Sequence, residues 1–495
     1  MLQRDDGQGP LIAMIQAAFD RHPKVAALLA GLLSATGFAP LSLWPVTLVC
    51  LAALIILIAK ASDRRTAFLR GWLFGVGHFT LGLNWIAHAF TFQDAMPHWF
   101  GYGAVILLSL YLAVYPGLAT LGTWWMTHRF ALSPTASLFM LAACWIVTEF
   151  LRATLFTGFA WNPLGVILLP TGAAISATVI GTYGLGALVI LAAGALMFAV
   201  HGQARLGGVI AAPIVLLALI GWITPAPLTP AGAPRPAPRL IFWPEAAIPA
   251  YLDMEPDWRA RLAGLLGPGD LLLTGGDKVY FKTVDQNGVP VSELAGANNS
   301  VWIVTPQATI AGRYSKAHLV PYGEYLPMRH ILEPIGLSRL VPGDADFWPG
   351  PGPQSLTLPA TLGRPSLKMG VQICYEIIFS GQVIDRDDRP AFLFNPSNDA
   401  WFGSWGPVQH LAQARLRALE EGMPIIRSTP TGVSAIIDAR GQIVRSIAPN
   451  RAGYLDSGLP PALAPTPFSR FGNILPALFT LGLLGAAVAT RRRSR

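Results

Sequence analysis

Eight long apolar runs constrain the fold of this chain more than any other feature of its sequence. The chain is 53% hydrophobic and only 13% charged. Because a helix needs about 20 apolar residues to cross a bilayer, the runs predict a polytopic α-helical membrane domain with about eight spans. They lie near residues 25–41, 44–60, 71–91, 101–127, 136–153, 178–200, 207–224 and 473–490. Since the first two runs are short, an alternative is a hairpin that does not fully cross.

Basic residues between the runs predict how the spans are oriented. Clusters precede the first run, separate the second from the third, and follow the fourth, sixth and eighth. If all eight runs span, every cluster falls on one side, which the positive-inside rule makes cytoplasmic. We therefore expect cytoplasmic termini and no nucleic-acid partner, although the net charge is +8. The clusters are Arg21, His22 and Lys24; Lys60, Arg64, Arg65 and Arg70; His128 and Arg129; His201 and Arg205; and Arg491, Arg492, Arg493 and Arg495.

The polar part of the chain predicts a second domain on the far side of the membrane, inserted before the last span. Proline-rich residues 225–238 indicate an extended linker after a membrane domain at 1–224. Residues 239–470 alternate short apolar strands with helical stretches such as 407–421, which is typical of an α/β sandwich. Residues 471–495 hold the last span and a basic tail. Strands are expected near 240–243, 271–274, 300–304, 369–373, 391–394, 424–428 and 433–437.

Three ionisable residues of this second domain lie at strand ends or in the loops that follow. Glu245 follows LIFWP, Lys316 lies in AGRYSKAHLVPYGEYLP, and Cys374 ends VQI. A thiol attacks a carbonyl only as a thiolate, which needs a base such as a glutamate, and a lysine can stabilise the resulting oxyanion. Taken singly, each has a simpler explanation, because such charges usually lie on the surface and such cysteines usually pack in the core.

The motifs around these residues resemble those of a known family. WPEAAIP, SKAHLVPYGEYLP, GVQICYE and NPSNDAWFG are similar to motifs of the nitrilase superfamily, which has a Glu-Lys-Cys triad on an αββα sandwich. With the eight runs and WIVTEFLRATLFTGFAWNPLG, the whole chain resembles the apolipoprotein N-acyltransferases. The resemblance implies that Glu245 is the general base, Lys316 the oxyanion partner and Cys374 the nucleophile. It also implies supporting roles for Glu324, Tyr375 and Glu376.

The same resemblance implies the last step of bacterial lipoprotein maturation. An acyl chain would pass from a membrane phospholipid through a Cys374 thioester to the α-amine of a diacylglyceryl apolipoprotein. The site would need no metal or cofactor and would face the periplasm from the inner membrane. Two alternatives stay open: a membrane-tethered amidase that passes the acyl group to water, and a catalytically silent paralogue that binds lipid or lipoprotein.

Other residues of the domain carry weaker or conflicting signals. Trp401 and Phe402 could bind substrate or dip into lipid, since aromatic side chains favour that interface. His318 lies close to Lys316, but the family's triad needs no histidine, so a structural role is expected. The chain also departs from the family, because we expect the opening strand and helix of the sandwich to be missing before Glu245. We therefore expect an exposed sheet edge at residues 240–243.

Overall fold

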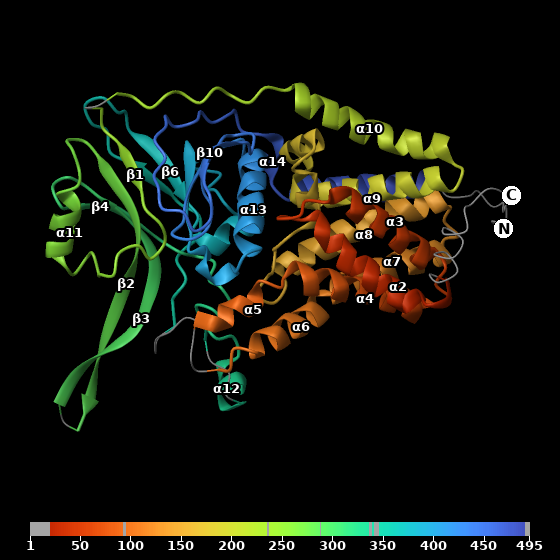
Figure 1. The fold of residues 1–495 in the computed structure, drawn as a ribbon, viewed down its shortest axis with the longest axis horizontal. Coiled ribbons are helices and arrows are strands. Elements are labelled where there is room, and N and C mark those ends of the chain that lie inside the picture. Colours follow the sequence, from red (N-terminus) through yellow and green to blue (C-terminus); the bar gives the residue numbers. More distant parts are fainter. Residues whose placement is uncertain are drawn as a thin grey trace.

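A bundle of apolar helices forms one end of the molecule, and a domain of two β-sheets forms the other (Figure 1). The computed structural model describes residues 20–92, 96–234, 237–287, 289–335, 339–340 and 346–490. Helices occupy most of each predicted apolar run. The run at 101–127 is divided at Ala113 into two helices, and the run at 71–91 is interrupted after Gly82, before the short helix α5 (Ile86–Ala89). The bundle helices are α2 (Pro23–Ser34), α3 (Trp44–Ala59), α4 (Arg64–Gly82), α6 (Phe100–Leu112), α7 (Val114–Arg129), α8 (Pro134–Thr154), α9 (Ala177–Val200), α10 (Ala204–Ile223) and α15 (Ile474–Ala489).

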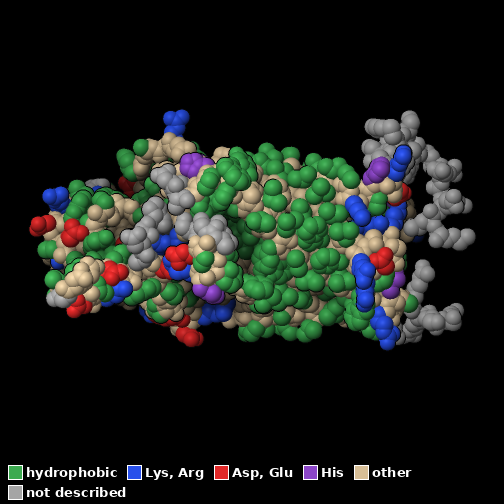
Figure 2. All heavy atoms as spheres, turned by 90° about the horizontal axis from the view of Figure 1, so that it is seen from below, with side chains coloured by type: hydrophobic (Ala, Val, Ile, Leu, Met, Phe, Trp, Pro, Cys, Tyr) green, Lys and Arg blue, Asp and Glu red, His purple; other side chains and the backbone are tan. Residues whose placement is uncertain are grey.

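Length and composition alone mark only part of this bundle as membrane-spanning. Within the described residues, four helical segments are long and apolar enough to cross a bilayer. They are Phe100–Arg129, Pro134–Thr154, Gly172–Val200 and Ala204–Ile223. Pro23–Gly37, Trp44–Ala59 and Ile474–Ala489 are apolar but shorter, so the count of eight spans stays a prediction. Figure 2 shows an apolar band across this face of the bundle with Lys and Arg side chains at one end, as a lipid-facing surface requires.

Two sheets, each covered by a helix on its outer face, form the second domain. The first sheet has the order β1-β2-β3-β4 and the second has the order β10-β9-β8-β7-β6-β5. The strands are β1 (Leu240–Phe242), β2 (Leu271–Gln286), β3 (Val289–Val304), β4 (Ile310–Ser315), β5 (Ser355–Leu358), β6 (Leu367–Val371), β7 (Phe392–Pro396), β8 (Ile425–Ser428), β9 (Ser434–Ile437) and β10 (Ile443–Ile447). The predicted strands at 271–274 and 300–304 are much too short, because β2 and β3 continue into a long antiparallel hairpin.

Alternating side chains along the strands create the layers. Leu273 and Ile303 point into the core shared with the second sheet, where Phe394 lies. Their neighbours Leu272 and Trp302 point outward into a smaller cluster with helix α11 (Pro256–Ala263). Successive residues of a strand face opposite sides, so one strand serves both layers. On the other side, α13 (Gly406–Glu421) covers the second sheet (Figure 1). The predicted αββα sandwich is confirmed.

β1 is the edge strand of its sheet, and side chains from elsewhere reach that edge. Between α10 and β1 the described residues form neither helix nor strand, and the chain runs extended past the domain (Figure 1). β1 pairs with β2 in parallel. The Ser428 hydroxyl donates to the Phe242 carbonyl (3.3 Å), and the Arg364 guanidinium donates to the Arg239 carbonyl (3.2 Å). Two backbone acceptors beside the edge are therefore satisfied by side chains.

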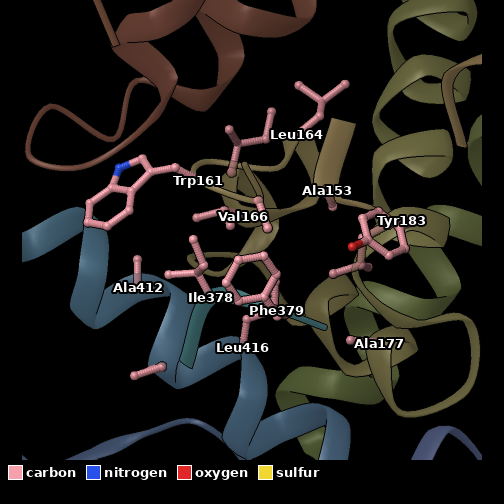
Figure 3. Close-up of a cluster of buried hydrophobic side chains, with 14 of the residues drawn as sticks. Ala153, Trp161, Leu164, Val166, Ala177, Tyr183, Ile378, Phe379, Ala412 and Leu416 are labelled. Atoms are coloured by element: carbon pink, nitrogen blue, oxygen red, sulfur yellow. The ribbon is translucent and has the colours of Figure 1, made fainter. Parts of the chain in front are cut away.

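The two domains share one apolar core where they meet. Figure 3 shows side chains from both domains in this core. Trp161 and Tyr183 come from the helical domain, whereas Phe379 and Leu416 come from the sandwich. Because α13 carries Leu416 and also packs on the second sheet, it lies between the sheet and the membrane helices (Figure 1). The position of the sandwich is therefore fixed relative to the bundle.

Candidate active site

Cys374 lies on a tight turn between the second sheet and a short helix. β6 ends at Val371, and the backbone of Gln372 still pairs with Phe394 (2.9 Å) before the chain enters η6 (Cys374–Ile378). Cys374 itself has φ of 50° and is 4% exposed. A left-handed backbone costs a residue with a Cβ on the order of 1–2 kcal/mol, so surrounding contacts must hold it. The turn lifts the thiol off the end of the strand, as expected for a nucleophile.

Glu245 and Lys316 approach each other from two strands of the first sheet. Glu245 follows β1 and is buried, while Lys316 follows β4 and is 1% exposed. The Lys316 ammonium lies 2.8 Å from a carboxylate oxygen of Glu324 and 3.6 Å from one of Glu245. Buried charges are tolerated when they are paired, and this ammonium has two carboxylate partners. Three predicted site residues therefore lie together.

Asn299 of β3 joins the two carboxylates. Its side-chain amide donates to Glu245 (2.6 Å) and to Glu324 (3.0 Å), and its backbone carbonyl accepts from Lys316 N (2.8 Å). The second oxygen of Glu245 accepts from the backbone N–H of Asn398 (2.6 Å). That of Glu324 accepts from the N–H of Val320 (2.8 Å). Both carboxylates are thus held by neutral donors as well as by the lysine, which fixes their orientation.

The charges of this group act directly on Cys374. Burial and then the Glu245 carboxylate raise the pKa of the Cys374 thiol, while Lys316 acts in the opposite direction. Burial alone would lower the pKa of Lys316, but the Glu324 and Glu245 carboxylates raise it above its ordinary value. The resting site therefore holds a protonated thiol and a charged ammonium. Such a thiol needs a base before it can attack, and Glu245 is the carboxylate whose charge acts most strongly on it.

A further carboxyl lies beside this group. Burial, followed by the Glu245 and Glu324 charges, raises the pKa of Asp277 to about 6. Asp277 on β2 lies directly opposite Asn299 on β3, which places the two side chains on the same face of the sheet.

Glu376 ties the cysteine turn to the loop that carries Lys316. One of its oxygens accepts from the Tyr314 hydroxyl (2.9 Å) and the Ala317 N–H (2.7 Å). The other accepts from the N–H of Ile373 (2.7 Å), just before the cysteine. Burial raises the pKa of Glu376 to about 7. Its contacts are structural, since they fix the spacing between the Cys374 turn and the loop that carries Lys316.

Tyr375 and His318 both reach the helical domain. The Tyr375 hydroxyl donates to the carbonyl of Gly158 (3.2 Å). His318 stacks on Phe379 with ring centroids 3.7 Å apart, and one ring nitrogen lies 3.3 Å from the carbonyl of Thr157. The loop after α8 therefore touches residues that lie close in sequence to Lys316 and to Cys374.

Trp401 and Phe402 also face aromatic side chains of the helical domain. Trp401 is half-buried with its ring 4.8 Å from that of Phe92. Phe402 is buried against Trp85 (4.8 Å) and Trp161 (5.1 Å). Phe402 thus contributes to the junction between the domains, and Trp401 has one exposed side at its rim.

Asn299 is the site residue that the sequence interpretation missed. A signal was present, because Asn298 and Asn299 stand side by side in a strand, where asparagine is uncommon. Such a residue inside a buried strand indicates a polar partner nearby. Its partners come from β1 and from the loop after β4, so only the sheet order reveals them.

Two protein-family models match this chain. The one described as apolipoprotein N-acyltransferase N-terminal domain matches residues 30–195, and the one described as carbon-nitrogen hydrolase matches residues 231–463. These ranges fall in the helical domain and the sandwich.

Relatives match along nearly the whole chain. An apolipoprotein N-acyltransferase from Rhodopseudomonas palustris is 33% identical, over 95% of this chain and 95% of its own. One from Caulobacter vibrioides is also 33% identical, over 94% of each. Among solved structures, a carbon-nitrogen hydrolase from Helicobacter pylori G27 is similar at 15% identity, covering 42% of this chain and 73% of its own with a TM-score of 0.27.

Proposed function

Since this chain belongs to the apolipoprotein N-acyltransferase family, we propose that it N-acylates apolipoproteins in lipoprotein maturation by two successive transfers through Cys374. The observation that supports this mechanism most is the convergence of Glu245, Lys316 and Glu324 at the Cys374 turn. Together with Cys374, these residues provide a base, a fixed cation and a buried nucleophile.

In the first transfer, Glu245 accepts the thiol proton as the sulfur of Cys374 attacks an ester carbonyl of a membrane phospholipid. A C–S bond forms, and the tetrahedral oxyanion is stabilised by the ammonium of Lys316. The ester C–O bond then breaks, and the leaving oxygen accepts from Glu245 the proton that came from the thiol. The products are a lysophospholipid and an acyl thioester on the enzyme.

In the second transfer, the α-amine of a diacylglyceryl-cysteine attacks the thioester carbonyl. Glu245 accepts a proton from the attacking nitrogen, and Lys316 again stabilises the oxyanion. The C–S bond breaks, and the proton returns to the sulfur. The raised pKa of the Cys374 thiol keeps it protonated at rest, so the first transfer needs a base to remove that proton. In this proposal Glu245 is the base in both transfers.

Glu324 is a supporting residue in this mechanism. Its carboxylate lies nearer to the Lys316 ammonium (2.8 Å) than that of Glu245 does (3.6 Å). An opposite charge at this range keeps the lysine charged and fixed in place. Glu245 is thus left less tightly paired and better able to accept a proton.

The helical domain accounts for the lipid nature of both substrates. Helices that present an apolar band to lipid would hold a phospholipid and a lipid-anchored protein at one depth. Sharing a depth turns a three-dimensional search into positioning at a surface. In this proposal the protein lies in a bacterial inner membrane, with cytoplasmic termini and the sandwich on the periplasmic side.

One experiment separates this proposal from its alternatives. Purified protein is incubated with phospholipid, with and without a diacylglyceryl-cysteine peptide, and N-acyl peptide and free fatty acid are quantified by mass spectrometry. The proposal expects N-acyl peptide, little fatty acid, and loss of product in Cys374→Ser. Fatty acid release at the same rate with and without peptide would mean a tethered amidase. No product under either condition, together with failure to complement an acyltransferase-depleted strain, would mean a silent paralogue.

A further inference from the structure

A buried histidine of α13 holds the carbonyl of the nucleophile. His410 is 0% exposed, and its Nε2 lies 3.0 Å from the carbonyl oxygen of Cys374. A carbonyl oxygen only accepts hydrogen bonds, so Nε2 must carry the hydrogen. The bond lies on the backbone of the residue whose φ is 50°.

The other ring nitrogen of His410 faces an arginine and a carboxylate. Nδ1 lies 3.1 Å from Nη2 of Arg427 and 3.1 Å from Oδ1 of Asp399. Nη2 carries two hydrogens. One is directed to the Asp399 carboxylate, whose oxygens lie 2.8 and 2.6 Å away, and this leaves the second for Nδ1 of His410. The ring is then a neutral imidazole with its hydrogen on Nε2.

The charges around His410 agree with that tautomer. Burial, followed by the Arg427 guanidinium, lowers the pKa of His410. Burial raises the pKa of Asp399, but the interactions of this carboxyl, with the Arg427 guanidinium first among them, outweigh burial and hold it in its charged form. Asp399 and Arg427 therefore form an ion pair beside a neutral ring.

This network is built from three separate elements of the sandwich. Asp399 begins η7 (Asp399–Phe402) after β7, Arg427 lies on β8, and His410 lies on α13. The Ser397 hydroxyl donates to Asp399 (2.6 Å), and Arg427 also donates to the side chain of Asn395. A fully buried ion pair is weak evidence for stability, since a packed apolar cluster often does as well. The presence of this ion pair is better explained by the geometry that it imposes on the ring of His410.

We propose that His410 is a positioning residue that holds the carbonyl of Cys374 and so keeps the nucleophile in its left-handed turn, with Arg427 and Asp399 fixing the ring tautomer. The inference rests on the proposed function, in which Cys374 is the nucleophile. Without the Nε2–H bond, Cys374 relaxes toward ordinary backbone angles and its thiol swings away from Glu245 and Lys316. A displacement of about 1 Å at a reacting atom can cost about a hundredfold in rate.

Contacts of the same helix extend this support to the membrane side. The neighbouring Gln409 accepts from Trp161 Nε1 (2.8 Å) and donates to the carbonyl of Ala39 (3.1 Å). The ring of His410 also lies 5.2 Å from that of Trp161 and 5.3 Å from that of Phe402. The nucleophile's carbonyl is therefore held by a helix that is itself anchored in the helical domain.

Two amide substitutions test the proposal, because they reproduce opposite ends of the imidazole. In His410→Gln the amide nitrogen is as many bonds from Cβ as Nε2 is, so it reaches the Cys374 carbonyl. In His410→Asn the amide stays beside Arg427 and Asp399 and cannot reach that carbonyl. Both variants retain polar partners in the buried site, which makes them a matched pair.

The readout is acylation of Cys374 in the full-length protein in detergent, measured by intact mass at several phospholipid concentrations. We expect H410N to lower the maximal acylation rate about tenfold to a hundredfold with unchanged half-saturation, and H410Q to retain most of the rate. Melting temperatures of both variants are recorded alongside. Equal rates in H410N and the wild type would overturn the inference, as would equal losses in H410N and H410Q at similar melting temperatures. An unacylated wild type would instead overturn the proposed function.

Discussion

Glu324→Gln tests how the ammonium of Lys316 interacts with its two carboxylate partners, Glu324 and Glu245. Lys316 lies 2.8 Å from Glu324 and 3.6 Å from Glu245. The substitution removes the charge of residue 324 but keeps an oxygen for the Asn299 amide. The ammonium then has one charged partner left, and we expect it to move into contact with Glu245.

The size of the effect follows from those two distances. With an effective dielectric constant of about 20, moving a unit charge from 3.6 to 2.8 Å adds about 1.3 kcal/mol of attraction. A carboxylate stabilised by that amount is a weaker base by about tenfold. We therefore expect E324Q to form the Cys374 thioester about tenfold more slowly, with unchanged half-saturation by phospholipid.

The assay is the rate of adduct formation on Cys374, followed by intact mass after mixing with phospholipid vesicles. Glu333→Gln is the matched control, because the Glu333 side chain is 63% exposed and pairs with Arg329 at the surface. It should acylate at the wild-type rate. An E324Q variant as fast as the wild type would refute the reasoning. A loss of a thousandfold or more would do so too, because Glu324 would then take part in the chemistry itself.

Three further predictions follow from the same contacts. Glu245→Gln removes a charge that raises the pKa of the Cys374 thiol, so alkylation of Cys374 by iodoacetamide at pH 8 should become faster. Acylation should fall at least about a hundredfold, because the base is lost. Slower alkylation in the variant would contradict this. Asn299→Leu deprives two buried carboxylates of a donor and should lower the unfolding free energy by about 1–3 kcal/mol, measured by thermal unfolding against the wild type. Because burial raises the pKa of Glu376 from 4.5 to about 7, its protonated form stabilises the fold at low pH. The melting-temperature difference between the wild type and Glu376→Gln should therefore shrink as the pH rises from about 4.5 to about 7, and a constant difference would refute the assignment.

The sequence was informative wherever a pattern was long or a residue stood at a strand end. Apolar runs of span length predicted every bundle helix, because lipid and buried helices demand the same composition. Glu245 and Cys374 each follow a short apolar stretch and Lys316 lies in a loop motif, and the three could be selected because these motifs resemble those of a known family. Their convergence depends on the sheet order, which no local pattern contains.

Strands at the sheet edges and the long hairpin escaped the interpretation for identifiable reasons. β10 is largely exposed and β5 is only four residues long, so neither shows a buried face in its sequence. β4 mixes glycine and arginine into its six residues. The hairpin did carry a signal, since Asn287-Gly288 between alternating segments is a strong turn sequence, and Asn287 has φ of 57°.

Contacts between distant segments were the hardest part to foresee. His410 reaches the Cys374 carbonyl from a helix that looked like an ordinary amphipathic cover for a sheet. Asp399 follows a strand, where such residues usually form turns, and its pairing with Arg427 became visible only with β7 and β8 side by side. In both examples the partners of a buried polar residue come from distant segments of the chain. The role of such a residue therefore depends on tertiary packing, which its place in the sequence does not show.

The most direct test of the central claim is the chemical form of Cys374 during turnover. Full-length protein is mixed with phospholipid, quenched in acid, digested and analysed by mass spectrometry, and a second sample is chased with a diacylglyceryl-cysteine peptide before quenching. The account predicts one acyl group in thioester linkage on the peptide that contains Cys374, and its disappearance in the chase as N-acyl peptide forms. An adduct at another residue, including one that persists there in Cys374→Ser, or N-acyl peptide formed without any adduct would contradict it.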